Sequence, residues 1–155
     1  TYIKVKGIWT YLYRAVDKEG QTVDFMLSIK RDEPAARAFF EKAIGSSGIP
    51  KKFNMDKSGA NKAGIDAINK MLYALFLIGY AAIQIFVRQV KYLNNLIEQD
   101  HRFIKKITQP MRGFKAFHSA HATLHGIELH HMLRKGQHQA SNHLSIFDQF
   151  YQLAA

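Results

Sequence analysis

The sequence predicts an α/β fold in which a mixed β-sheet is flanked by helices. The first thirty residues show the alternation and the glycine-containing turn of antiparallel strands. From Glu33 onward the apolar residues recur at helical spacing, and helical segments then alternate with short apolar strands. Hairpin strands followed by alternating helices and strands indicate a mixed sheet with helices on its faces.

The expected elements follow one another without an internal repeat. They are strands at 2–6, 9–16 and 22–29, a helix at 33–45, a strand at 49–55, a helix at 59–72, a strand at 83–87 and helices at 92–108 and 113–134. Asp32 is a predicted N-cap with Pro34 in the first turn, and Gly45 is the predicted helix end. We expect residues 1–135 to form one core and residues 136–155 a C-terminal tail or docking helix.

Composition limits the partners and cofactors of the chain. Lysine and arginine total 22 against 12 acidic residues, giving a formal charge of +10. Polyanions are therefore the expected partners, nucleic acid first and an anionic membrane surface second. The absence of cysteine excludes disulfides and cysteine-ligated metal sites and is compatible with a cytoplasmic location.

One uncharged stretch, residues 71–87, is close to the shortest length that spans a bilayer. We interpret it as protein core instead, because Gly79 is a plausible helix end and residues 83–87 have the β-branched and aromatic composition of a buried strand. A membrane-associated helical protein remains the less favoured alternative.

Two acidic residues stand out. Asp56 follows an apolar strand directly, although it is equally suited to cap the next helix. Glu98 shares one helical face with Arg102 and Lys105, a spacing also typical of a solvated salt-bridge ladder. Together, a strand-end aspartate and a helix glutamate are the oxygen ligands that a magnesium site requires, and the basic residues would hold DNA phosphates.

Several motifs resemble those of bacterial insertion-sequence transposases of the sixth insertion-sequence family. They are TYIKVKG at 1–7, YLYRAVD at 11–17, RQVKYLNN at 88–95 with EQDHR at 98–102, GIE at 126–128 and RKGQ at 134–137. The resemblance spans nearly the whole chain, and the motif around Glu98 is the most specific part of it.

This resemblance implies a DDE-type transposase core with a ribonuclease-H-like, retroviral-integrase-like fold. Asp56 matches the second aspartate of the Asp-Asp-Glu triad and Glu98 the glutamate, while Lys105, Arg102 and Lys91 would position DNA. The implied reaction is phosphoryl transfer with two Mg²⁺ or Mn²⁺ ions, first to water and then to a DNA 3′-hydroxyl. The implied partners are transposon ends and target DNA, bound by a homodimer or higher oligomer at the bacterial nucleoid.

The chain departs from the family pattern in two ways. The first aspartate of the family stands two positions before Thr1 and is absent, so we expect this truncated chain to be inactive. Forty-one residues separate Asp56 from Glu98, more than is usual in the family, and the surplus falls at residues 73–82. A nucleic-acid-binding module without catalysis is therefore the main alternative function.

The histidines offer another kind of site. His118, His121 and His125 lie at helical spacing, and imidazoles placed in this way can bind zinc. The same stretch matches a basic and aromatic helix of the family, so we expect these histidines to face solvent or DNA.

Overall fold

The computed structural model describes residues 1–90, 95–138 and 144–154. Its first three strands, β1 (Tyr2–Val5), β2 (Ile8–Val16) and β3 (Thr22–Ser28), form an antiparallel sheet in that order. The predicted strands are confirmed to within a residue at each end. The turn between β2 and β3 is closed by Asp17, whose Oδ1 accepts hydrogen bonds from the backbone amides of Glu19 and Gln21.

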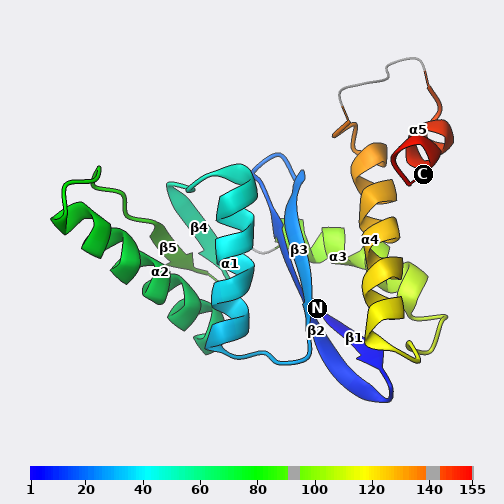
Figure 1. The fold of residues 1–155 in the computed structure, drawn as a ribbon. Coiled ribbons are helices and arrows are strands. Elements are labelled where there is room, and N and C mark those ends of the chain that lie inside the picture. Colours follow the sequence, from blue (N-terminus) through cyan, green and yellow to red (C-terminus); the bar gives the residue numbers. More distant parts are fainter. Residues whose placement is uncertain (91–94, 139–143, 155) are drawn as a thin grey trace.

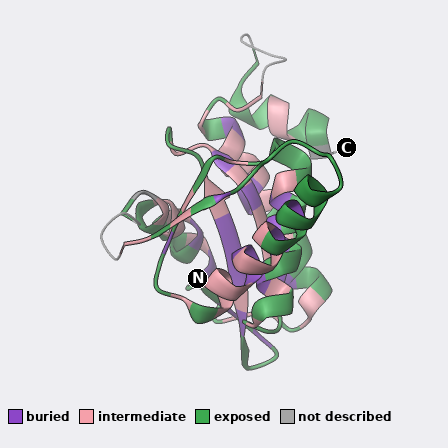
Figure 2. Cartoon of the chain, turned by 90° about the vertical axis from the view of Figure 1, so that its left-hand side faces the viewer, coloured by how far each residue is buried: buried purple, intermediate pink, exposed green. Residues whose placement is uncertain are grey.

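Helices cover both faces of this sheet (Figure 1). On one face, helix α1 (Glu33–Ser47) and helix α2 (Gly59–Leu77) form a core with Tyr13 of β2. On the other face, helix α3 (Asn95–Thr108) and helix α4 (Phe117–Arg134) form a second core with Ile3, Val5, Leu12 and Leu27. The middle of the sheet therefore lies at the buried centre of the molecule, whereas the turn between β1 and β2 projects from it (Figure 2). The alternation along β2 accounts for both cores, because successive side chains point to opposite faces of a sheet.

Helix α1 begins as predicted and ends later than predicted. The Asp32 side chain caps it by accepting a hydrogen bond from the Ala35 amide, and Pro34 lies in its first turn. The helix continues through Gly45 to Ser47 and ends at Gly48, whose φ of 82° is readily reached only by glycine. The prediction that Gly45 ends the helix was wrong because Gly45 keeps a helical backbone.

The predicted α/β class, with antiparallel and parallel strands, is confirmed, but the strands of the described residues form two sheets where one mixed sheet was expected. Strands β4 (Lys52–Met55) and β5 (Phe86–Gln89) pair in parallel as a separate two-stranded sheet. Strand β5 begins at Phe86, not at residue 83, because the side-chain amide of Asn69 bonds both the N–H and the C=O of Ile85. These backbone groups are satisfied by α2, which leaves the residues before Phe86 outside the β-ladder.

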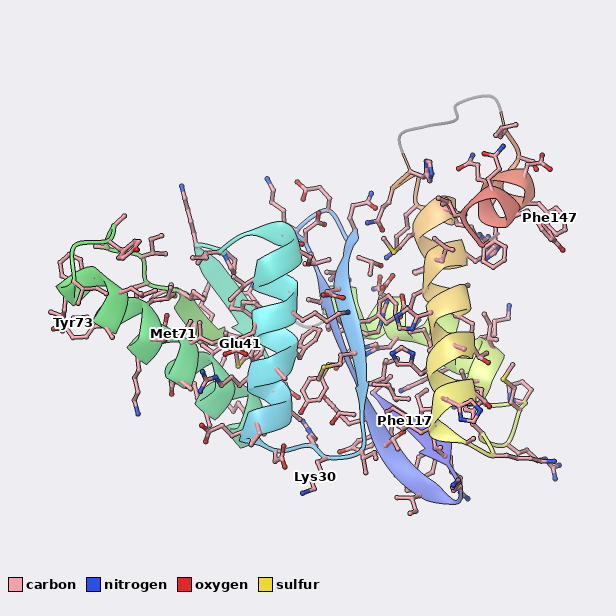
Figure 3. The ribbon with its side chains drawn as sticks, in the orientation of Figure 1. Lys30, Glu41, Met71, Tyr73, Phe117 and Phe147 are labelled. Carbon is pink, nitrogen blue, oxygen red and sulfur yellow. The ribbon has the colours of Figure 1, made fainter. Side chains whose placement is uncertain are left out.

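The apolar stretch at 71–87 is divided between three kinds of structure. Helix α2 continues to Leu77, five residues beyond its predicted end, and the chain leaves it through Gly79 at φ 98°. Many apolar side chains of this stretch are exposed, among them Met71 and Tyr73 of α2 (Figure 3). In the part of the chain that the structure describes, no helix is long and apolar enough to cross a membrane.

The segment between α3 and α4 is held against β1. Phe114 accepts a hydrogen bond from the Lys6 amide at 2.7 Å and donates one to the Lys4 carbonyl at 2.8 Å. This pairing delays the start of α4 to Phe117, whereas the sequence predicted residue 113. After α4, a short helix α5 (Ile146–Ala154) packs on α4 and directs Phe147 outward (Figure 3).

Gly64 provides a test of how closely α1 and α2 pack. An added Cβ would lie 2.9 Å from the Arg37 backbone nitrogen and 3.0 Å from the Ala36 Cβ, so one helix must move. We expect Gly64→Ala to lower the free energy of unfolding by about 1–3 kcal/mol, measured by urea denaturation. The matched variant Gly45→Ala adds a Cβ into open space within α1 and should raise it by up to about 1 kcal/mol. Equal effects of the two variants would contradict this packing.

Candidate active site

A cleft of about 520 Å³ lies between the two sheets and α3. Its walls include Tyr11 to Arg14 of β2, Phe53 to Met55 of β4 and the first turns of α3. The cleft thus occupies the place where a continuous mixed sheet was expected. Carboxylates and basic side chains from separate elements reach into this one space.

Asp56 enters the cleft from the end of β4. Its exposed side chain accepts a hydrogen bond from Asn61 Nδ2 at 3.4 Å, and Arg31 Nη2 lies 3.5 Å from its Oδ2. It does not cap α2, because the N-cap is Ser58, whose side chain accepts a hydrogen bond from the Asn61 amide. The capping interpretation of Asp56 was therefore wrong, and its carboxylate remains open to the cleft.

Glu98 enters the same cleft from the first turn of α3, together with Arg102 and Lys105. All three side chains are exposed, which leaves them accessible to a ligand. Lys91, which was also predicted to contact DNA, lies outside the described residues. Asp56 and Glu98 offer the hard oxygen donors that a divalent ion prefers. Within residues 1–90, 95–138 and 144–154, no group of three or more His, Cys, Asp or Glu side chains could hold a metal ion.

A buried ionic cluster fixes α3 behind the cleft. Arg14 of β2 donates hydrogen bonds from Nε and Nη2 to the carboxylate of Glu128 on α4, at 2.6 and 2.9 Å. Arg14 Nη2 also lies 2.6 Å from Asp100 Oδ2 on α3. The side chains of Arg14 and Glu128 are completely buried, so each depends on the other for compensation of its charge.

Asp100 joins this cluster to the end of α4. Its Oδ1 lies 2.7 Å from His131 Nε2 and 2.6 Å from Lys135 Nζ. Burial acts to raise the pKa of Asp100, but Lys135, His131 and Arg14 outweigh burial and lower that pKa to about 2. The carboxylate therefore remains ionised over the whole neutral range.

The RKGQ motif at 134–137 fastens the end of α4 to the hairpin of β2 and β3. Lys135 Nζ donates to the Gly20 carbonyl at 2.8 Å, and the Gln137 side chain bonds both the N–H and the C=O of Thr22 at 2.9 Å. In the sequence, this motif, Arg14 and Glu128 stood out only as parts of the motifs that resemble insertion-sequence transposases. The sequence pattern that could have predicted their pairing is that Arg14 and Glu128 occupy core-facing positions of a strand and a helix, where an unpaired charge is not tolerated.

His101 also lines the cleft, although the sequence alone did not indicate a role for it. Its ring is largely buried, and its Nε2 has no hydrogen-bond partner among the described residues. Burial, reinforced by the nearby cations Arg14 and Lys105, lowers the pKa of His101 to about 3. The imidazole is therefore neutral at physiological pH and presents an uncharged polar edge.

Of the three histidines of α4 considered as zinc ligands, His121 and His125 lie side by side, with ring centroids 4.1 Å apart. His118, His121 and His125 are exposed, and His125 Nδ1 bonds the His121 carbonyl while its ring contacts Phe25. No zinc-binding cluster is found in the described part of the chain, which removes the geometric basis for the zinc alternative. His131 stacks on Phe103 instead and belongs to the buried ionic cluster.

Comparison with known protein families identifies the class of protein to which this cleft belongs. A family model described as a DDE domain, of the IS240 transposase type, matches residues 1–137. The chain therefore belongs to the DDE domain family of transposases.

Two similar proteins identify the type of transposase more closely. The chain is 42% identical over 135 residues to the transposase of the insertion sequence-like element IS431mec from Staphylococcus aureus. It has the same identity to the transposase of insertion sequence element IS257 in transposon Tn4003 from that species. Each match covers 87% of this chain and 55% of the relative, so the chain spans about half the length of these transposases. The resemblance to the sixth insertion-sequence family is thereby confirmed.

An uncharacterized protein of Yersinia pseudotuberculosis is 38% identical over 72 residues, which cover 44% of this chain and 67% of that protein. No solved structure matches the chain.

The pKa of Asp100 in the buried cluster predicts how the free energy of unfolding depends on pH. The pKa of Asp100 is about 2 in the folded chain against 3.8 ordinarily, so ionised Asp100 stabilises the fold above pH 4, and this stabilisation is lost as the pH falls through 2. Asp100→Asn should lower the free energy of unfolding by at least about 2 kcal/mol at pH 6, and the difference should shrink between pH 4 and 2. Urea denaturation across this range measures it.

The matched control is Glu19→Gln, which removes an exposed carboxylate from the turn between β2 and β3. It should change the stability by only a few tenths of a kcal/mol, as expected for a solvated pair. A constant difference between the parent chain and Asp100→Asn from pH 6 to 2 would contradict the assigned pKa.

Proposed function

We propose that this chain is the catalytic core of a transposase that cleaves DNA strands and joins their ends by metal-dependent phosphoryl transfer. The observation that carries the proposal is the convergence of Asp56 and Glu98, from β4 and α3, on one cleft that Arg102 and Lys105 also line. Membership of the DDE domain family supports a role for these two carboxylates in binding divalent metal ions. The two curated transposases support the assignment to insertion-sequence transposition.

The proposed architecture is a ribonuclease-H-like core at residues 1–135 with a C-terminal tail or docking helix at 136–155. The antiparallel β1–β2–β3 sheet followed by helix, strand, helix and strand supports this architecture. The family match to residues 1–137 ends near the proposed boundary. Residues 146–154 pack on α4, which agrees with a docking role.

In this proposal Asp56 and Glu98 hold the divalent ions, two Mg²⁺ or Mn²⁺ in the complete site. Bound ions would stabilise charge on the attacking and leaving oxygens of the phosphoryl group. Arg31 competes for Asp56, but their contact is a loose 3.5 Å pair between half-exposed side chains and is easily replaced. Helix α3 fixes the direction of Glu98 through Asp100, two residues further on, which is anchored on Arg14.

Arg102 and Lys105 have the proposed role of holding the DNA backbone, as does Lys91. They lie one and two turns after Glu98 on α3, so phosphates bound to them would lie beside the carboxylates. The net charge of +10 favours such a partner. Transposon ends and target DNA are the proposed substrates, bound by a dimer or larger assembly.

A second candidate function is DNA binding without catalysis. Asp56 and Glu98 have no third acidic or histidine partner among the described residues, which favours this candidate for the 155-residue chain alone. Two carboxylates provide few anionic oxygens to hold two strongly hydrated magnesium ions. Strand cleavage distinguishes the two functions.

The cleavage experiment compares the 155-residue chain with one extended upstream by two residues, so that it includes the first aspartate of the family. We expect Mg²⁺-dependent nicking of DNA carrying a transposon end from the extended chain and almost none from the shorter chain. Glu98→Gln or Asp56→Asn in the extended chain should lower the rate by more than about a hundredfold. Glu41→Gln, which removes an exposed carboxylate of α1, is the control and should leave the rate unchanged. Cleavage that survives Glu98→Gln would place the catalytic site elsewhere.

DNA binding by the 155-residue chain should weaken steeply with salt, because bound lysine and arginine release counterions from the phosphates. Lys105→Gln should lower the affinity for duplex DNA and reduce the slope of log K against log salt by about 1, measured by fluorescence anisotropy. Lys18→Gln, at a 90% exposed side chain on the turn between β2 and β3, is the matched control and should not change the slope. An affinity independent of salt would exclude a phosphate-dominated interface.

A further inference from the structure

A second groove, of about 480 Å³, adjoins the catalytic cleft. It lies between the outer edge of β1 and residues 108–114, at the end of α3 and in the segment that follows. Thr1, Tyr2 and Lys105 line both hollows, so the two form one continuous surface. Any strand held at Lys105 is therefore already at the mouth of this groove.

The lining of the second groove combines positive charge with an exposed indole. Lys4, Lys105 and Arg112 contribute three cations, and no acidic residue lines the groove. Trp9 is 62% exposed, although an indole is among the largest apolar groups that a protein can bury. Lys4 and Trp9 are direct cross-strand partners, and Lys4 Nζ lies 5.8 Å from the centre of the indole.

The two sides of the groove are joined by backbone hydrogen bonds. The hydrogen bonds of Phe114 to Lys4 and Lys6 join the segment after α3 to β1. Gly113 approaches so closely that an added Cβ would lie 3.0 Å from the Lys4 carbonyl oxygen. Arg112 precedes this contact directly and lines the same groove as Trp9. A ligand would bind without first ordering the chain, which favours affinity.

We propose that this groove binds unpaired nucleotides of the DNA strand that leaves the catalytic cleft, with one base stacked on Trp9 and the phosphates held by Lys4, Lys105 and Arg112. Aromatic side chains stack on any base, and lysine and arginine follow the backbone, so this combination suits single-stranded DNA of any sequence. A base within a duplex is already stacked on its neighbours and cannot offer its face to an indole. The inference rests on the proposed transposase function and adds a single-strand subsite to it.

Trp9 is the only tryptophan of the chain, so the tryptophan emission, excited selectively over tyrosine, reports on this groove alone. The 155-residue chain is titrated with a single-stranded oligonucleotide of about 12 nucleotides and with a blunt duplex of equal length. Anisotropy of labelled DNA measures saturation independently. We expect strong quenching of Trp9 by the single strand at saturation and little quenching by the duplex. Unchanged emission with saturating single strand, or equal quenching by the duplex, would overturn the proposal.

Substitutions then identify the contacts. Trp9→Ala should weaken single-strand binding about tenfold, whereas Trp9→Phe, which keeps an aromatic face, should weaken it less than about threefold. Arg112→Gln should weaken it and lower its salt dependence, while the distant Lys18→Gln should do neither. Equal affinities of Trp9→Ala and the parent chain would contradict stacking. Emission from the unsubstituted chain remains decisive if a Trp9 variant folds poorly.

Failure of this inference is distinguishable from failure of the proposed function. If the groove proposal is wrong, DNA saturates the chain without a change in Trp9 emission, and cleavage by the extended chain still depends on Glu98. If the catalytic proposal is wrong, cleavage is absent or insensitive to Glu98→Gln while Trp9 is still quenched. The two measurements therefore test the two sites independently.

Discussion

The buried charge of Arg14 is the constraint on which the arrangement of the other elements depends. A guanidinium removed from water is costly unless carboxylates surround it, and here they come from Glu128 on α4 and Asp100 on α3. One side chain on β2 thus orients two helices that are distant in sequence. Loss of either carboxylate would remove ion pairing from a fully buried guanidinium, so alternative rotations of α3 and α4 are strongly disfavoured.

The orientation of α3 has a direct consequence for the cleft. Side chains two residues apart point to nearly opposite sides of a helix, since each residue turns the chain by about 100°. Asp100 faces the buried cluster, and Glu98 consequently faces away from it, where it lines the cleft with Asp56. The same packing places Arg102 and Lys105 at the cleft wall and continues into the groove beside Trp9. Structural ion pairing and the proposed chemistry are therefore parts of one arrangement.

Local sequence signals predicted most of the elements because short-range physics determines them. Asp32 and Pro34 start α1, Asp17 and Gly20 close the hairpin, and the alternation in β2 separates its two faces. The errors have tertiary causes. Asn69 captures the backbone of Ile85, Phe114 pairs with β1 before α4 can begin, and the cleft separates β4 from the first sheet. Each of these errors arises from a contact between residues far apart in the chain, and the periodicity of the sequence does not predict such contacts.

The sequence by itself determined the class of the protein: its motifs, above all the one around Glu98, resemble those of insertion-sequence transposases and thereby indicated a DDE core, and the excess of positive charge agreed with a DNA partner. Only the tertiary structure decided that both carboxylates open into one cleft, that Ser58 and not Asp56 caps α2, and that Arg14 is the anchor of α3. The physical reason is the range of the forces involved. Strand pleat, helix period and capping act within a few residues, whereas burial of a charge depends on which distant groups the folded chain brings to it.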